Sequence, residues 1–211
     1  MKLDSLIKIP GYNYYEYLLV INPHQILCDK IMQEKKEFAD KFRAPLAYKT
    51  LPHITLVNFL QFEMRERLVI NHLQKIAAGY HPVKVDLKGF GSFPSHTIFI
   101  NVESMQQIQN LVKELRPAQQ IMTLNKDNKP HFIMNPHLTL VRKLAPWQYE
   151  KAWPEYSERH FSGHFIANGM ILLRRPVDVL ADGKFFTGKY QVAGRFAFMN
   201  MPVNSKQAEL F

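Results

Sequence analysis

Apolar residues along this chain recur in two kinds of pattern, which together predict a mixture of strands and helices. Short apolar runs bounded by Gly, Pro, Asn or Ser are typical of strands, whereas apolar positions three or four residues apart are typical of amphipathic helices. Strands are predicted at residues 14–21, 51–60, 83–90, 97–102, 136–143, 161–174 and 185–198. Helices are predicted at residues 23–42, 63–78, 103–116 and 147–158.

The order of these elements indicates an α+β fold, with antiparallel sheets inside and helices outside. A length of 211 residues predicts one domain over residues 1–211, and two pseudo-symmetric lobes would also fit. The segment between the helix 103–116 and the strand 136–143 reads as a long loop. Residues 204–211 are expected to form a frayed tail.

Local signals mark the course of two of the helices. Asn22 is a suitable N-cap for the first helix, with Pro23 in its first turn. Pro154 is expected to kink or split the helix 147–158. The apolar stripe of the first helix is predicted to consist of Ile26, Leu27, Ile31 and Phe38.

One short pattern occurs twice along the chain. Residues 52–56 read PHITL and residues 136–140 read PHLTL, so that they differ by one exchange of Ile for Leu. Neighbouring side chains of a strand point to opposite faces, so His53 and Thr55 share one face, as do His137 and Thr139. Each predicted strand therefore buries an aliphatic face and presents an imidazole beside a hydroxyl.

Two such strands facing each other would gather two imidazoles and two hydroxyls around one point. An ordinary imidazole gains or loses its proton near neutral pH, which suits general acid–base catalysis. The hydroxyls of Thr55 and Thr139 can donate to phosphate oxygens where negative charge develops. A single histidine of this kind is more often a structural strand residue, but the duplication favours a catalytic role for His53 and His137.

These motifs resemble those of the 2H phosphoesterase superfamily, and more closely its bacterial 2'-5' RNA ligase / RNA 2',3'-cyclic phosphodiesterase branch. Residues 17–23, 89–94 and 97–102 are similar to stretches of that branch, and the second motif extends to Arg142 as in the family. The resemblance implies two lobes related by a pseudo-twofold axis, with the motif strands lining a central groove. Asn58 departs from the family pattern, which often has an apolar residue there, and so does the Arg-Arg-Pro stretch 174–176.

Three further residues are candidates for substrate binding. The guanidinium of Arg142 suits a phosphate, but strict alternation places it on the face opposite His137, so a bend or bulge is needed to bring it to the site. Phe93 lies at the predicted hairpin turn, where its ring could stack on a base or pack against the core. Tyr48, five residues before His53, is a weaker candidate.

Composition narrows the class of partner. The formal net charge of +9 favours a polyanionic ligand, although a solvated basic surface has the same composition. The chain shows no apolar run of membrane-spanning length and no secretory signal, so a cytoplasmic monomer without membrane contact is expected. Cys28 is the only cysteine, which excludes an internal disulfide and indicates a small core residue.

Metal and cofactor motifs are missing from the sequence, and so are those of ATP-driven ligases. No spacing of His, Cys and acidic residues forms a zinc pattern, and there is neither a phosphate-binding Gly-rich loop nor a Lys-x-Asp-Gly motif. The leading interpretation is a metal-independent phosphodiesterase acting on RNA 2',3'-cyclic phosphate ends or 2'-5' linkages, and any ligation would be the reverse reaction. Two alternatives stay open: the same chemistry on a small nucleotide, such as ADP-ribose cyclic phosphate or a 2'-5' oligoadenylate, and a non-catalytic RNA-binding module.

Overall fold

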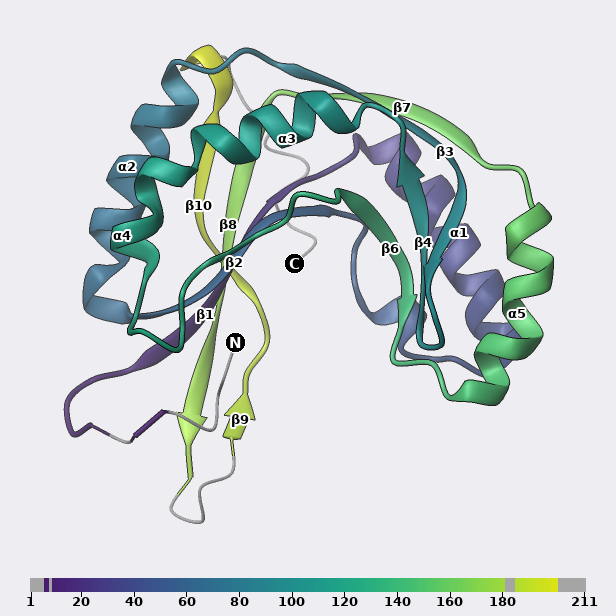
Figure 1. The fold of residues 1–211 in the computed structure, drawn as a ribbon, viewed down its shortest axis with the longest axis horizontal. Coiled ribbons are helices and arrows are strands. Elements are labelled where there is room, and N and C mark those ends of the chain that lie inside the picture. Colours follow the sequence, from purple (N-terminus) through teal and green to yellow (C-terminus); the bar gives the residue numbers. More distant parts are fainter. Residues whose placement is uncertain (1–5, 8, 181–184, 201–211) are drawn as a thin grey trace.

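The computed structural model describes residues 6–7, 9–180 and 185–200. Its sheet has the strand order β10-β8-β1-β2-β6-β4-β3-β7, with β5 alongside β2 and β9 alongside β8. All of the strand pairs are antiparallel, and helices lie outside the sheet (Figure 1). The predicted α+β class is therefore confirmed.

The strands are β1 (Tyr14–Ile21), β2 (Ile54–Phe62), β3 (Val83–Phe93), β4 (Thr97–Val102), β5 (His131–Phe132), β6 (His137–Arg142), β7 (Ser162–Ala167), β8 (Gly169–Val179), β9 (Phe185–Thr187) and β10 (Gln191–Ala197). The α-helices are α1 (Gln25–Phe42), α2 (Glu66–Ala78), α3 (Met105–Glu114), α4 (Gln119–Met122) and α5 (Pro146–Glu158). Short 3-10 helices are η2 (Ala47–Lys49), η3 (Glu63–Arg65), η4 (Arg116–Ala118) and η5 (Phe198–Asn200).

The order of the strands is pseudo-symmetric about the pair β2–β6. Strand β1 flanks β2 as β4 flanks β6, with β8 and β3 next and β10 and β7 outermost. Figure 1 shows α1 and α5 beside the half that contains β6, β4 and β3, whereas α2 and α4 lie beside the other half. One continuous apolar core joins the inner sides of these helices to both halves of the sheet. The two motif strands thus lie together at the centre of the fold.

The first helix begins later than predicted. His24, not Asn22, is the N-cap, since its ring Nδ1 accepts a hydrogen bond from the backbone N–H of Leu27 at 3.4 Å. Ile26 was expected on the apolar stripe but is 79% exposed, because in the first turn of α1 it faces solvent. The stripe therefore begins at Leu27 and continues through Ile31 and Phe38, all of which are buried.

Other predicted boundaries also needed correction. Helix α5 is not split at Pro154, which was one of the two outcomes expected there, and its buried residues Ala152 and Tyr156 lie on either side of the proline. The expected strand 161–174 is two strands, β7 and β8, which pair in opposite halves of the sheet. The expected long loop contains η4, α4 and β5. The predicted tail 204–211 lies outside the described residues.

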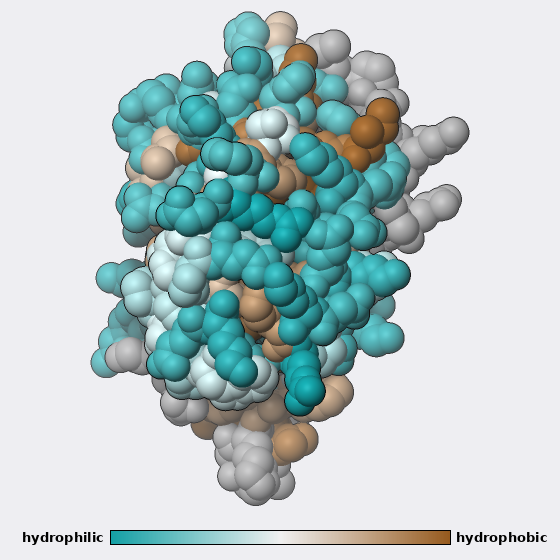
Figure 2. All heavy atoms as spheres, turned by 90° about the vertical axis from the view of Figure 1, so that its right-hand side faces the viewer, coloured by the Kyte–Doolittle hydropathy of each residue, from teal (hydrophilic) through white to brown (hydrophobic). Residues whose placement is uncertain are grey.

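The side of the molecule that carries α1 and α5 is mostly hydrophilic, with small apolar areas between polar side chains (Figure 2). This is the pattern expected when helices bury one face against a sheet and leave the other in water. Among the described helices, none combines the length and the apolar character needed to cross a membrane.

Candidate active site

The two repeated motifs lie side by side because Ile54 of β2 and Leu138 of β6 are partners in the antiparallel register. That register sets His53 across from Thr139, and Thr55 across from His137. The aliphatic residues of both motifs are buried in the core, while the two histidines and two threonines stay partly exposed on the opposite face. This face of the sheet is called the histidine face below.

Both motif strands contain a bulge at the same place. In β2 the partners of Thr55 and Val57 are the neighbours Val20 and Leu19, so Leu56 is an extra residue in the pairing with β1. In β6 the partners of Thr139 and Val141 are likewise neighbours in β4, so Leu140 is extra. A bulge shifts the alternation of side chains by one position.

The consequence of the bulges is that the third residue after each threonine returns to the histidine face. Asn58 follows Thr55 in this way, and Arg142 follows Thr139. Strict alternation would place Arg142 on the face opposite His137, and the bulge at Leu140 brings it to the histidine face. The guanidinium of Arg142 lies near enough to His53 to lower the pKa of its imidazole. The side-chain oxygen of Asn58 is buried without a hydrogen-bond partner among the described residues.

The imidazole of His53 is oriented by the backbone of its own strand. Its Nδ1 lies 2.8 Å from the carbonyl oxygen of Leu51, and since a carbonyl only accepts, Nδ1 carries a proton and Nε2 is the nitrogen without one in the neutral ring. Desolvation by the surrounding protein lowers the pKa of His53 to about 4, and the positive charges of Lys35, Arg142 and His137 act in the same direction. The hydrogen bond to the Leu51 carbonyl opposes these effects. His53 is therefore neutral at pH 7.

The imidazole of His137 is held in the same way and also contacts two aromatic rings. Its Nδ1 lies 2.9 Å from the carbonyl oxygen of Asn135. The rings of Phe93 and Phe99 lie with their centroids 5.1 and 5.0 Å from that of His137. A Cβ on Gly91 would come within 2.6 Å of the Phe99 ring, so glycine makes room for this cluster.

The structure brings the predicted residue Phe93 to the site. Phe93 is 39% exposed and its ring packs edge-to-face with that of His137, so it offers an exposed aromatic surface beside the histidine on which a base could stack. Tyr48 lies on η2 with half of its side chain exposed. Among the ring contacts of residues 6–7, 9–180 and 185–200, none joins Tyr48 to either histidine.

The arginines that depart from the family pattern already have partners within the fold. Arg174 donates to the Glu66 carboxylate at 2.9 and 3.0 Å. Arg175 pairs with Glu16, and its guanidinium lies 4.7 Å from the centre of the Tyr190 ring. Both arginines of β8 therefore form ion pairs with carboxylates of neighbouring elements.

Sequence reasoning missed two residues that support the histidines. Lys35 of α1 donates from Nζ to the carbonyl oxygen of Thr50 at 2.7 Å, and Gln109 of α3 donates from Nε2 to the carbonyl oxygen of Met134 at 2.8 Å. Lys35 lies four residues after Ile31 and three before Phe38, so its place on the buried stripe of the helix was a signal that the sequence contained. The sequence around Gln109 contains no comparable spacing that would mark it as a support of His137.

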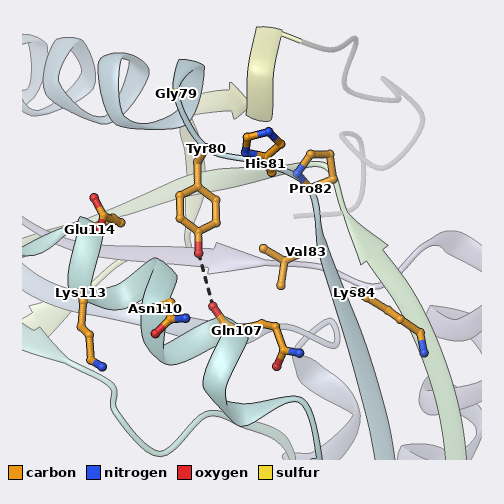
Figure 3. Close-up of a pocket in the computed structure, with 10 residues that line it drawn as sticks. All are labelled: Gly79, Tyr80, His81, Pro82, Val83, Lys84, Gln107, Asn110, Lys113 and Glu114. Atoms are coloured by element: carbon orange, nitrogen blue, oxygen red, sulfur yellow. Dashed lines mark hydrogen bonds between the residues drawn. The ribbon is translucent and has the colours of Figure 1, made fainter.

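In the described part of the chain, no group of three or more His, Cys, Asp or Glu side chains is arranged to hold a metal ion. One pocket of about 580 Å³ lies between the end of α2, the start of β3 and α3, and none of the predicted site residues lines it (Figure 3). There the Tyr80 hydroxyl points to the Gln107 carbonyl oxygen at 3.5 Å, and Lys113 and Glu114 bring opposite charges. Lys84 also lines the pocket, which therefore has basic side chains as well as one carboxylate.

A pseudo-symmetric sheet with a His-x-Thr motif on each central strand defines the class of the 2H phosphoesterases. A family model of the 2'-5' RNA ligase superfamily matches residues 28–178, which include both motifs, and the chain belongs to this family. No curated protein matches the chain.

Several solved structures share the fold. That of Escherichia coli LigT complexed with 3'-AMP has a TM-score of 0.59 at 15% identity, over 88% of this chain and 98% of LigT. LigT complexed with phosphate has a TM-score of 0.53 at 16% identity, over the same shares. TT0787 of Thermus thermophilus has a TM-score of 0.59 at 18% identity, over 87% of this chain and 98% of that protein.

Proposed function

We propose that the protein is a metal-independent phosphodiesterase that acts on RNA 2',3'-cyclic phosphate ends or on 2'-5' phosphodiester linkages. The observation that carries this proposal is the central register, which sets each histidine across from the threonine of the other motif. The membership of the chain in the 2'-5' RNA ligase superfamily supports the same class of chemistry.

The arrangement has the parts that hydrolysis of a phosphodiester requires. One imidazole accepts a proton from the attacking water, and the other donates a proton to the ribose oxygen that leaves phosphorus. General acid–base catalysis of this kind contributes roughly 10²–10⁴-fold. Thr55 and Thr139 donate hydrogen bonds to the non-bridging oxygens as their negative charge increases, and Arg142 supplies a positive charge on the same face.

The substrate could be either an RNA strand or a small nucleotide. The net charge of +9 favours an RNA strand, whose phosphates would contact basic side chains outside the site. A small nucleotide is the second candidate, because LigT, which shares the fold, was solved with 3'-AMP. A non-catalytic RNA-binding module is the weaker alternative, since both copies of the motif retain the histidine and the threonine.

The test is turnover of a substrate panel by protein that has been treated with a chelator. The panel contains a nucleoside 2',3'-cyclic phosphate, an oligonucleotide with a terminal cyclic phosphate, and 2'-5' and 3'-5' dinucleotides. We expect hydrolysis of the cyclic phosphates or of the 2'-5' linkage in excess EDTA, and no hydrolysis of the 3'-5' control. Activity that disappears with EDTA and returns with a divalent cation would contradict the metal-independent mechanism.

A further inference from the structure

The two histidines of the proposed mechanism are held by the same pattern of hydrogen bonds, and each set of bonds is called a support below. Each Nδ1 lies against the carbonyl oxygen two residues earlier, which belongs to Leu51 for His53 and to Asn135 for His137. In each case, the carbonyl oxygen three residues before the histidine accepts a hydrogen bond from a helix side chain. The donor is Lys35 in the first support and Gln109 in the second.

The supports differ in charge, and this difference breaks the symmetry of the site. Lys35 is only 1% exposed and donates both to the carbonyl oxygen of Thr50 and to its hydroxyl at 3.3 Å. Burial lowers the pKa of Lys35 to about 8, which leaves the amine mostly protonated at pH 7. Gln109 makes the equivalent contact with a neutral amide.

We propose that Lys35 and Gln109 are positioning residues that set the direction of proton transfer. Desolvation is the main cause that keeps His53 neutral, and the ammonium of Lys35 acts in the same direction, so that His53 is the general base of hydrolysis. The neutral amide of Gln109 supports His137 without opposing its protonation, so that His137 is the general acid. This assignment of roles rests on the proposed function, whereas the electrostatic asymmetry can be measured without it.

The charges around His53 come from two elements and share one sign. Lys35 approaches from α1, and Arg142 and His137 approach from β6, and each of them lowers the pKa of His53. Around Lys35 itself, the Cys28 thiol on the same helix raises the pKa of the amine and Arg142 lowers it. Lys35 is therefore the charge whose replacement changes the support of His53 while the histidine face keeps all of its residues.

In this assignment, hydrolysis is a direct attack of water on phosphorus. Nε2 of His53 takes a proton from water as the water oxygen bonds to phosphorus. The bond from phosphorus to one ribose oxygen breaks, and Nε2 of protonated His137 donates its proton to that oxygen. The products are a phosphate monoester and a free ribose hydroxyl, and proton exchange with solvent restores both rings.

The direct experiment is an NMR titration of the two imidazoles in the wild type, Lys35→Gln, Lys35→Met and Gln109→Lys. Lys35→Gln copies the support of His137 at His53, and Lys35→Met removes the charge and the hydrogen bond together. We expect both variants to raise the titration midpoint of His53 by about half a pH unit or more, and to move that of His137 less. Gln109→Lys should lower the midpoint of His137. Thermal melting confirms that each variant is folded.

A kinetic arm separates this role from a merely structural one. In Lys35→Gln, the acid limb of kcat/KM against pH should move to higher pH, and in Lys35→Arg, which keeps the charge, it should stay near that of the wild type. Gln109→Lys should move the basic limb to lower pH. Gln109→Met should lower the rate without moving either limb, because it removes a hydrogen bond and no charge.

Three outcomes decide the matter. An unchanged His53 midpoint in a folded Lys35→Gln or Lys35→Met variant would overturn the proposal. If neither variant folds, the Gln109→Lys titration decides instead, and an unchanged His137 midpoint overturns the proposal. If the midpoints move as expected but the wild type hydrolyses nothing in the substrate panel, the asymmetry stands and the proposed function fails.

Discussion

Ile54 and Leu138 are register partners at the centre of the sheet, and each is the middle residue of a His-x-Thr motif. Because both side chains point into the core and are fully buried, the flanking histidines and threonines must point to the opposite face. A slip of one residue between β2 and β6 would turn one motif inward and dismantle the site. The core thus holds the two His-x-Thr motifs in register.

The hydroxyls of Thr55 and Thr139 should stabilise the transition state. Thr55→Val and Thr139→Val keep the shape of the strand and are each expected to lower kcat by roughly 10²–10³-fold, since each removes one donor to the charged phosphate oxygens. The matched variants Thr55→Ser and Thr139→Ser keep the hydroxyl and should retain most of the activity. Equal rates in the Val and Ser variants would exclude this role for the hydroxyls.

Phe93 should bind the base of the substrate. Phe93→Ala removes a stacking surface worth about 1–3 kcal/mol, which predicts a rise in KM of roughly 5- to 150-fold for a nucleoside cyclic phosphate. Ribose cyclic phosphate serves as the control, because it has no base that could stack on Phe93. Any rise in its KM would come from the loss of the contact between Phe93 and His137. Phe93→Trp should keep the KM low. If KM rises equally for both substrates, Phe93 supports His137 and does not stack on the base.

The low pKa of His53 makes the folded state sensitive to acid. The pKa of His53 is about 4 in the fold against 6.5 ordinarily, so below pH 6.5 the unfolded chain binds the proton more readily. Above pH 6.5 His53 is neutral in both the folded and the unfolded state, so its titration costs no stability. As the pH falls from 6.5 toward 4, protonation of the unfolded chain lowers the free energy of unfolding by at most about 3 kcal/mol. Urea unfolding at pH 7 and pH 4.5 should show a smaller loss of stability in His53→Gln than in the wild type. His164→Gln, at an exposed position on β7, should behave like the wild type.

The net charge should matter for long substrates. Lys126 and Lys129 are exposed on the segment before β5 and are expected to contact the RNA backbone. Affinity for an oligonucleotide should then fall steeply with salt, while affinity for a cyclic mononucleotide should fall only slightly. The double variant Lys126→Gln/Lys129→Gln should reduce the slope of log K against log salt by roughly 1–2 for the oligonucleotide alone. Equal slopes for both ligands would favour a small nucleotide as the substrate.

Much of the histidine face was predictable from the sequence, because alternation in a strand depends only on local geometry. The motif residues His53, Thr55, His137 and Thr139 share a face, as the pattern predicted. The position of Arg142 was not predictable in the same way, since it depends on a bulge whose extra residue, Leu140, looks like any other strand aliphatic.

The supports of the histidines depend on contacts between distant segments. Lys35 lies in a run of charged residues that reads as a solvated helix face, and only its spacing from Ile31 and Phe38 marks it as buried. Its acceptor, the carbonyl of Thr50, is backbone and leaves no trace in the sequence. The late start of α1 has a local cause instead, because the ring of His24 accepts the hydrogen bond from Leu27 N–H that was expected for an N-cap at Asn22.

The most direct test of the two-histidine mechanism is hydrolysis of a nucleoside 2',3'-cyclic phosphate by His53→Ala and His137→Ala in excess EDTA. Each variant removes one half of a coupled proton transfer, so each is expected to lose roughly 10²–10⁴-fold in turnover while keeping the wild-type fold by circular dichroism. His164→Ala is the matched control and should keep full activity. Near-normal turnover by either folded variant, under conditions where the wild type is active, would contradict the account.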